Sequence, residues 1–268
     1  MKLSPANVML CVLLWLPLSP VLAAAAQLKD PGSPTILITG SNRGVGLALA
    51  QEYARRGWNV IATCRTPREA TELRALASSN PKVLVEELDV TSHEDIQALA
   101  RKYRGIPIDV LFNNAGVLGD PPKQQFGNLD EGLFEDVMEI NALAPLKVAE
   151  AFVDNVAASG QKKIIGMTSG LGSLTLMERM SRFYYYQMSK AALNMGMRAL
   201  RNDLRGRGIT VALLAPGMVS TELLAESGYR GKALTPAESA AALYELVAAL
   251  TPEDKGVPIN VDGKSIPW

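Results

Sequence analysis

The chain is poor in the residues that build disulfide frameworks and metal sites. Its 268 residues include two cysteines, Cys11 and Cys64, and one histidine, His93. Cys11 lies in an N-terminal leader, so the body of the chain has one cysteine and cannot form an internal disulfide. His93 follows Thr91 and Ser92, a helix-capping pair, and is predicted to be an exposed residue of a first helical turn. No metal site is therefore expected.

An excess of charge of one sign is also missing, and so are internal repeats and low-complexity runs. The 27 basic and 27 acidic residues leave no formal net charge, which gives no indication of a nucleic-acid partner. A hydrophobic share of 48% is ample for a core, and the length fits one domain, predicted over 34–268. Helices are predicted at 67–78, 92–104, 130–158, 183–206 and 236–250, and they alternate with predicted strands.

The N-terminal residues 1–26 have the pattern of a targeting segment. Lys2 precedes an apolar run over 8–18, and an Ala-Ala-Ala cleavage site lies at 24–26. This order is typical of a secretory signal peptide and predicts export or a lumenal location. Two alternatives stay open, an uncleaved membrane anchor and a disordered leader on a cytoplasmic protein. Pro17 and Pro20 disfavour the anchor.

A glycine-rich loop stands between a predicted buried strand, Thr35–Thr39, and a predicted helix from Leu47. The loop consists of Gly40, Ser41, Asn42, Arg43, Gly44, Val45 and Gly46. Its spacing is G-x-x-x-G-x-G, in which the glycines allow a tight turn and close approach of a diphosphate to the helix N-terminus. The pattern predicts dinucleotide binding on a Rossmann-like, doubly wound parallel α/β sheet of about seven strands, with helices on both faces.

The second predicted strand, 58–64, lacks the acidic residue that binds the ribose 2′-hydroxyl in the usual NAD pattern. The strand ends in Thr63 and Cys64 and is followed by Arg65. Arg65 and Arg43 are suited to pair with a 2′-phosphate, because guanidinium groups match phosphate oxygens. We therefore expect NADP(H) to be preferred over NAD(H).

A tyrosine and a lysine four positions apart, Tyr186 and Lys190, lie on one face of the predicted helix 183–206. A nearby ammonium favours the phenolate and lowers the pKa of a tyrosine. The pair is therefore predicted to act in general acid–base chemistry. Tyr184 and Tyr185 do not share this face, which favours packing roles for both.

Taken together, these motifs resemble the short-chain dehydrogenase/reductase family from about Pro34 onward. Within that family the chain is most similar to sniffer-type carbonyl reductases and C-factor-like proteins. The cues are the stretch from Tyr186 to Met195 and the ending from Asn260 to Trp268. Phe183 stands where the enoyl-reductase branch has its tyrosine, which argues against reduction of a carbon–carbon double bond.

The resemblance implies roles for further residues. Asp89 and Val90 would flank the adenine. The stretch Asn113, Asn114, Ala115 and Gly116 would stabilise the sheet and line the cofactor. Pro216, Gly217, Val219 and Thr221 would hold the nicotinamide. Asn141 would take part in a proton relay to Lys190. Ser169 would bind the substrate carbonyl, with Ser173 as the alternative.

The implied function is NADP(H)-dependent interconversion of a ketone or aldehyde and its alcohol, with Tyr186 as general acid or base. The expected pocket is apolar and rich in methionine, which suits an apolar substrate. Its expected members are Leu118, Phe126, Leu171, Leu174, Leu176, Met177, Met180, Phe183, Tyr184, Met218, Leu223, Leu224 and Tyr229. The alternative is a non-catalytic dinucleotide-binding signalling protein of the C-factor-like type. By family analogy a homodimer is expected.

Overall fold

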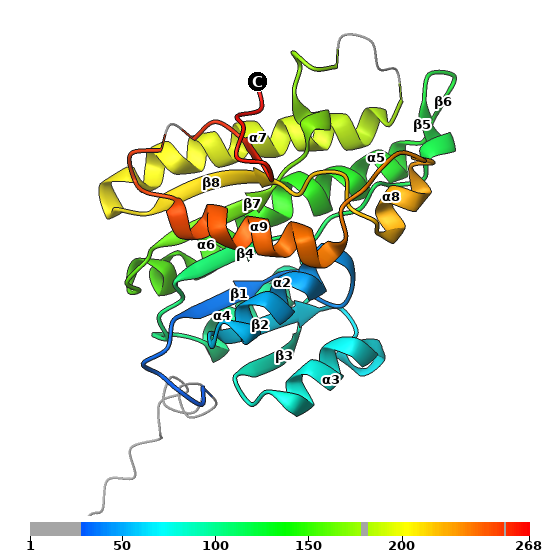
Figure 1. The fold of residues 1–268 in the computed structure, drawn as a ribbon. Helices are drawn as coiled ribbons and strands as arrows, with labels where there is room; N and C mark the ends of the chain where they lie inside the picture. Colours follow the sequence, from blue (N-terminus) through cyan, green and yellow to red (C-terminus); the bar gives the residue numbers. More distant parts are fainter. Residues whose placement is uncertain (1–27, 178–181, 255) are drawn as a thin grey trace, which may run out of the picture.

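The computed structural model describes residues 28–177, 182–254 and 256–268, which form a parallel sheet between two layers of helices (Figure 1). The seven strands lie in the order β3-β2-β1-β4-β7-β8-β9. Their bounds are Thr35–Ile38 (β1), Asn59–Cys64 (β2), Val83–Glu87 (β3), Val110–Asn113 (β4), Lys163–Met167 (β7), Thr210–Ala215 (β8) and Ile259–Asn260 (β9). The predicted doubly wound α/β fold is confirmed.

The central strands are apolar on both faces because helices cover both faces. Along β1, Ile36 and Ile38 pack into one hydrophobic cluster, whereas Leu37 between them packs into the other. The same alternation holds in β2, where Val60 and Ile61 belong to different clusters. An uninterrupted apolar run in this sequence therefore indicates a strand buried on both sides.

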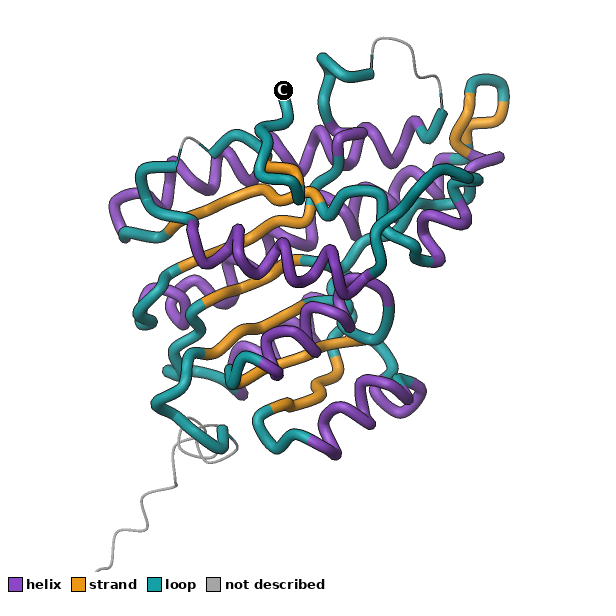
Figure 2. The backbone as a smooth tube through the Cα atoms, viewed as in Figure 1, coloured by secondary structure: helices purple, strands orange, loops and turns teal. Residues whose placement is uncertain are grey.

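The helices divide between the two clusters. Figure 2 shows the corresponding layers of helices on the two faces of the sheet. The first cluster includes residues of α2 (Gly44–Arg55), α3 (Thr71–Ser79) and α9 (Pro236–Ala249). The second includes residues of α4 (His93–Lys102), α6 (Ala144–Ala157) and α7 (Tyr184–Leu204). Short 3-10 turns lie at Pro67–Glu69 (η1), Pro121–Lys123 (η2), Gly170–Gly172 (η4) and Arg205–Arg207 (η5). These layers fill the two sides of the sheet.

Side-chain caps fix the start of several helices. The Ser92 hydroxyl accepts the Asp95 amide hydrogen at 3.1 Å, so His93 is the first residue of α4 and is exposed, as predicted. Thr235 and Glu238 form a reciprocal capping box at α9.

The predicted helix 130–158 is three elements. α5 (Glu131–Met138) leads into a single π-helical turn, η3 (Glu139–Leu143), and then into α6. Pro145 lies in the first turn of α6 and has no N–H, so the regular α-helical bond to the carbonyl of Asn141 cannot form. The sequence pattern did not separate these elements because all three keep an apolar face.

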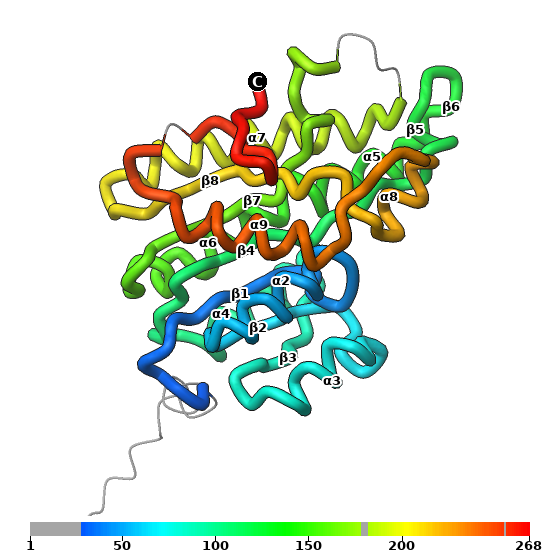
Figure 3. Tube along the Cα trace, viewed as in Figure 1, coloured from blue at the N-terminus to red at the C-terminus, as the bar shows by residue number. Residues whose placement is uncertain are grey.

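Four other short helices and strands were not predicted. They are β5 (Gln124–Gln125) and β6 (Asn128–Leu129), which form a hairpin, the helix α8 (Glu222–Glu226) and strand β9. Each is too short for periodicity to reveal. In the chain traced in Figure 3, the hairpin and α8 lie near the start of α7. No helix within the described ranges is both long enough and apolar enough to cross a bilayer. The predicted signal peptide lies outside the described residues.

Candidate active site

A cleft of about 1940 Å³ opens at the carboxyl ends of the parallel strands. It lies beside β1 and β4, where the order of strands reverses and where open sheets of this type bind ligands. All predicted catalytic and cofactor-binding residues line it except Asn113 and Asn141. Segments that are distant in sequence thus meet at one site.

The glycine loop needs its glycines for backbone reasons. Gly40 and Gly44 have φ angles of 68° and 57°, in the left-handed region that favours glycine. A Cβ on Gly46 would overlap the carbonyl oxygen of Gly40 and come within 2.5 Å of Asn114 Nδ2. At these glycines the main chain of the loop itself therefore reaches the edge of the cleft.

Helix α2 begins at this loop with free N–H groups. Its N-cap, Arg43, makes no side-chain cap bond, and the first turn carries no acidic residue. Gly44, Val45 and Gly46 of that turn line the cleft. Unpaired N–H groups and the positive end of a helix fit a dinucleotide diphosphate.

The two arginines predicted to bind phosphate have different surroundings. Arg65 follows β2, lines the cleft and is exposed, with Glu69 on the same wall. Arg43 also lines the cleft, but it forms a 2.5 Å ion pair with Glu222 of α8. That pair connects the glycine loop to the loop after β8, so Arg43 has a competitor for any phosphate.

Asn113 and Asn114 have different surroundings. Asn113 is the last residue of β4 and is buried, and neither of its side-chain polar atoms has a hydrogen-bond partner among the residues that the structure describes. Asn114 lines the cleft, and its Nδ2 donates to the carbonyls of Thr39 and Gly40 at 2.9 and 3.0 Å. Thr39 Oγ1 accepts the amide hydrogens of Asn114 and Ala115, both at 3.0 Å. Asn114 and Thr39 therefore connect β1 to β4, which is the sheet-stabilising role expected of this stretch.

Asp89 and Val90 line the cleft beyond β3, as the resemblance implied. The Asp89 carboxylate already accepts from the amide and hydroxyl of Thr91 at 2.9 and 2.8 Å. These bonds fix the turn after β3.

The loop after β8 closes the opposite side. Gly217 has a φ of 78°, and a Cβ there would lie 2.8 Å from Val261 Cγ1. The Pro216 carbonyl accepts from Ser239 Oγ at 2.8 Å, and Val219 is bridged to Leu234. Thr221 caps α8 by accepting from the Leu224 amide. The predicted nicotinamide loop is thus rigidly held beside the glycine loop.

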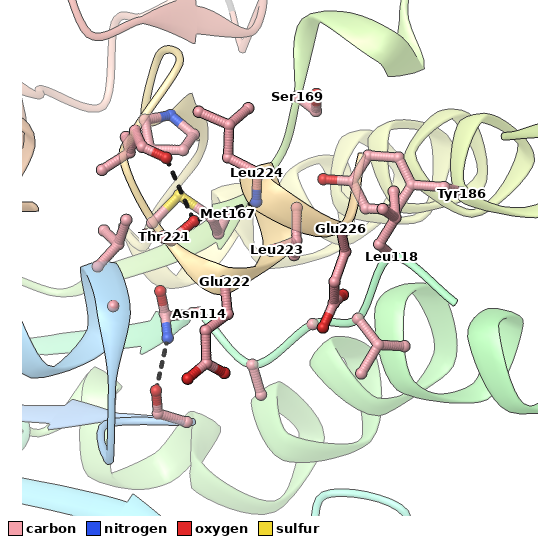
Figure 4. A pocket seen from close by; sticks show the side chains of 18 of the residues that line it. Asn114, Leu118, Met167, Ser169, Tyr186, Thr221, Glu222, Leu223, Leu224 and Glu226 are labelled. Atoms are coloured by element: carbon pink, nitrogen blue, oxygen red, sulfur yellow. Dashed lines mark hydrogen bonds between the residues drawn. The ribbon is translucent and has the colours of Figure 1, made fainter. Parts of the chain in front are cut away.

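Tyr186 and Lys190 lie in the first half of α7, and Ser169 lies just after the end of β7. Figure 4 shows Tyr186 and Ser169 on the wall of the cleft. The Tyr186 side chain is buried, and its hydroxyl points into the cleft. Lys190 Nζ lies 5.6 Å from the centre of the Tyr186 ring and donates to the carbonyl of Met167 at 2.9 Å. The predicted serine, tyrosine and lysine are brought together.

The pKa of Tyr186 is raised, whereas the sequence predicted that a nearby lysine would lower it. Burial raises the pKa of Tyr186 to about 12, although hydrogen bonding with Ser169 opposes part of the rise. Burial also lowers the pKa of Lys190 to about 8. Desolvation is the larger cause of the Tyr186 shift, and the Lys190 amine donates to the Met167 carbonyl and not to the phenol. At neutral pH the phenol therefore keeps its proton and can donate it.

Asn141 is fully buried in η3 and does not line the cleft. Its Oδ1 accepts from the Val117 amide at 2.9 Å, and its Nδ2 donates to the Val117 carbonyl at 2.8 Å. The same Nδ2 donates to Ser189 Oγ at 3.0 Å. Its side-chain amide is therefore occupied in joining the loop after β4 to α7.

The choice between Ser169 and Ser173 is one of geometry. Ser169 lines the cleft, and its Oγ accepts the Leu171 amide at 3.1 Å. Ser173 is buried outside the cleft lining, where it accepts from Leu176 and donates to the Trp268 carbonyl. This arrangement favours Ser169 as the substrate-binding serine.

The predicted apolar pocket is formed in large part. The cleft wall includes Leu118, Leu171, Leu176, Met177, Phe183, Met218, Leu223, Leu224 and Tyr229. Phe126, Leu174 and Tyr184 are not on that wall, and Phe126 is 88% exposed at the tip of the β5–β6 hairpin. Met180 lies outside the described residues. Charged residues that sequence reasoning missed, Arg182, Glu222 and Glu226, also line the cleft. They follow no motif, so only the tertiary structure reveals them.

The similarities to known proteins agree with this geometry. A chain 35% identical over 237 residues is the 1-hydroxy-2-glutathionyl-2-methyl-3-butene dehydrogenase of Rhodococcus sp., with 87% of this chain and 99% of that protein covered. The C-signal protein of Myxococcus xanthus is 35% identical over 162 residues, covering 60% of this chain and 93% of that protein.

Solved structures give the same result. The NADPH-bound carbonyl reductase from chicken fatty liver has a TM-score of 0.80 and 30% identity, over 88% of this chain and 99% of that one. Carbonyl reductase Sniffer of D. melanogaster has a TM-score of 0.80 and 27% identity, over 88% and 100%. The family model for short chain dehydrogenases matches residues 34–230. The chain therefore belongs to the short-chain dehydrogenase/reductase family of oxidoreductases.

Proposed function

We propose that this protein is an NADP(H)-dependent carbonyl reductase that acts on an apolar ketone or aldehyde. The observation that carries the proposal is the buried Tyr186 phenol, directed into the cleft, close to Ser169 and protonated at neutral pH. A neutral phenol is the form needed to donate a proton to a carbonyl oxygen as it becomes an alkoxide.

The residues of the chain would divide the work at the substrate oxygen. Ser169 Oγ and the Tyr186 hydroxyl would donate hydrogen bonds to the oxygen as its negative charge develops. Tyr186 would then transfer its proton, a role typically worth about 10²–10⁴-fold in rate. When bound, the reduced nicotinamide supplies the hydride.

Lys190 and Asn141 would support that proton transfer. Lys190, which is fixed by the Met167 carbonyl, would hold the ribose beside Tyr186 and carry protons toward Asn141. Since the Asn141 side chain is fully bonded, a water in this relay would bind its main-chain carbonyl, to which Pro145 cannot donate.

The choice of NADP(H) is supported by Arg65 on the cleft wall and by the lack of an acid at the end of β2. It is also supported by relatives: the chicken carbonyl reductase was solved with NADPH, and a short-chain dehydrogenase/reductase of Burkholderia multivorans with NADP. NAD(H) is less suited, although Glu69 stands nearby.

A panel of aldehydes, ketones, quinones and steroids, with NADPH consumption as the readout, tests the proposal. We expect turnover with at least one bulky apolar carbonyl compound and little with small polar ones. Tight NADPH binding without turnover of any compound would instead favour a non-catalytic signalling protein, for which the similarity to C-signal is the supporting observation.

Two further proposals concern assembly and location. A homodimer is favoured by exposed apolar residues, namely Leu143 of the π-helical turn η3 and Met188 and Met195 of the long helix α7. Sedimentation would test it. Export through a cleaved N-terminal signal follows from the sequence pattern alone. Mass spectrometry of the mature N-terminus in separated cell fractions would test this location, and a start at Met1 in the cytosol would contradict it.

A further inference from the structure

Gln124 is a buried polar side chain in an otherwise exposed hairpin. It is 0% exposed, whereas its neighbour Gln125 is exposed. The Gln124 Nε2 donates to the carbonyl of Leu118 at 2.8 Å, and its Oε1 accepts the backbone amide of Tyr186 at 3.1 Å. Leu118 and Tyr186 both line the part of the cleft that contains the apolar pocket, which we call the substrate end. We call this connection the glutamine bridge.

Helix α7 lacks a cap of its own at the turn that carries Tyr186. Its N-cap is Phe183, which has a φ of 60° and makes no side-chain cap bond. The amide of Gln187 bonds the Phe183 carbonyl at 2.9 Å, which leaves the amides of the first three residues without helical partners. Tyr186 is the third, the position that a capping side chain normally satisfies. Gln124 supplies that acceptor from 62 residues away.

The other end of the bridge is a wall of the substrate pocket. Leu118 forms an apolar cluster with Phe183 and Tyr186. The turn after Leu118 makes room for the amide, because a Cβ on Gly119 would lie 3.0 Å from Gln124 Nε2. The bridge therefore joins the main chain of the proposed proton donor to the main chain of the wall that faces it.

We propose that Gln124 is a positioning residue that sets the distance between the Tyr186 phenol and a substrate carbonyl. This inference rests on the proposed function, in which that phenol donates the proton. A displacement of about 1 Å in a reacting group can cost about 10²-fold in rate. Without the bridge the first turn of α7 is free to shift, while the cofactor-binding end of the cleft keeps its own supports.

The first test compares Gln124→Leu with Gln125→Leu, an exposed glutamine on the same strand. For Gln124→Leu we expect kcat to fall by about 10- to 100-fold while the Kd for NADPH changes less than about twofold. Gln125→Leu should behave as wild type, and melting temperatures report whether each variant folds. A wild-type kcat in Gln124→Leu, or an equal loss of kcat and NADPH binding, would overturn the proposal.

Gln124→Glu gives a second test with a pH readout. A protonated carboxyl can donate to Leu118 and accept from Tyr186 as the amide does, but a carboxylate cannot donate. Burial beside a carbonyl raises the pKa of that carboxyl, so kcat should be near wild type at low pH and fall as pH rises through it. A profile parallel to wild type would mean that the side chain only fills space.

Amide hydrogen exchange at Tyr186 separates this inference from the proposed function. In Gln124→Leu the Tyr186 amide should exchange at least about tenfold faster than in wild type or Gln125→Leu. This expectation does not depend on whether a substrate has been identified. Faster exchange in a protein that reduces no carbonyl compound would reject the reductase but keep the bridge. Unchanged exchange would reject the bridge whatever the activity.

Discussion

The two ends of the cleft are held in different ways. The dinucleotide end is formed by contiguous chain, since β1, the glycine loop and the start of α2 follow one another over 35–46. The substrate end depends on side chains that bond across long sequence separations. Tyr186 is held by Gln124, 62 residues away, and Lys190 donates to the carbonyl of Met167, 23 residues away. The groups that would bind the diphosphate thus come from one contiguous segment, which Asn114 bonds from 74 and 75 residues away, whereas the catalytic groups of the substrate end come from separate segments.

This difference implies that cofactor binding and turnover can be disrupted separately. Backbone N–H groups and glycines form the diphosphate site, so changes at the substrate end should leave NADPH binding intact. Changes on the arginine wall should weaken binding without altering the Ser169–Tyr186 geometry. The following variants test that separation in both directions.

The largest effect is expected from Tyr186→Phe. This change removes the proton donor and should lower kcat by about 10²–10⁴-fold, with the Kd for NADPH nearly unchanged. Steady-state turnover and NADPH fluorescence titration measure the two quantities. Tyr185→Phe is the matched control, because Tyr185 packs against Phe134 and does not line the cleft. Retained turnover in Tyr186→Phe would remove the phenol from the chemistry.

Arg65→Asp should have the next largest effect, on NADPH binding at the dinucleotide end of the cleft. Loss of a charge-assisted phosphate contact and the new repulsion should weaken NADPH binding by about 100-fold, and NADH binding should change little. Arg68→Asp makes the same charge change on an exposed residue outside the cleft lining. A wild type that prefers NADH would contradict the assignment of Arg65.

The pH dependence of NADPH binding tests Lys190, which lies where the two ends of the cleft meet. The pKa of Lys190 is lowered to about 8, so the amine is charged below pH 8 and neutral above it. If the cofactor favours the charged amine, affinity should be level below pH 8 and fall by about tenfold over the following one to two pH units. Lys190→Arg, which stays charged, should give a level profile. A level wild-type profile would exclude this role for Lys190.

The smallest effect is expected from Glu222→Gln. The Arg43–Glu222 pair is about two-thirds exposed on both sides, and such pairs contribute at most about 1 kcal/mol. Its removal should free Arg43 for the 2′-phosphate and tighten NADPH binding by up to about fivefold. Glu245→Gln removes a similarly exposed partner from Arg56, away from the cleft, and should have no effect. Weaker binding in Glu222→Gln would mean that the pair holds the cleft together.

How far the sequence predicted the site depends on which end is considered. The glycine loop, Arg65 and the Tyr186–Lys190 pair were predicted because each follows a strand or shares a helix face. The direction of the Tyr186 pKa shift was not, because desolvation depends on neighbours distant in sequence. The π-helical turn at Asn141 and the position of Asn113 outside the cleft lining were also missed, since both depend on contacts between segments.

By itself the sequence determined the order of strands and helices, the double-sided burial of the sheet and the glycine loop, because these depend on periodicity and on local backbone freedom. Only the tertiary structure decided that Gln124 supports the Tyr186 turn, that Glu222 competes for Arg43 and that the phenol is kept neutral. Hydrogen bonds and desolvation depend on distances in space, which sequence spacing does not specify once a chain has folded.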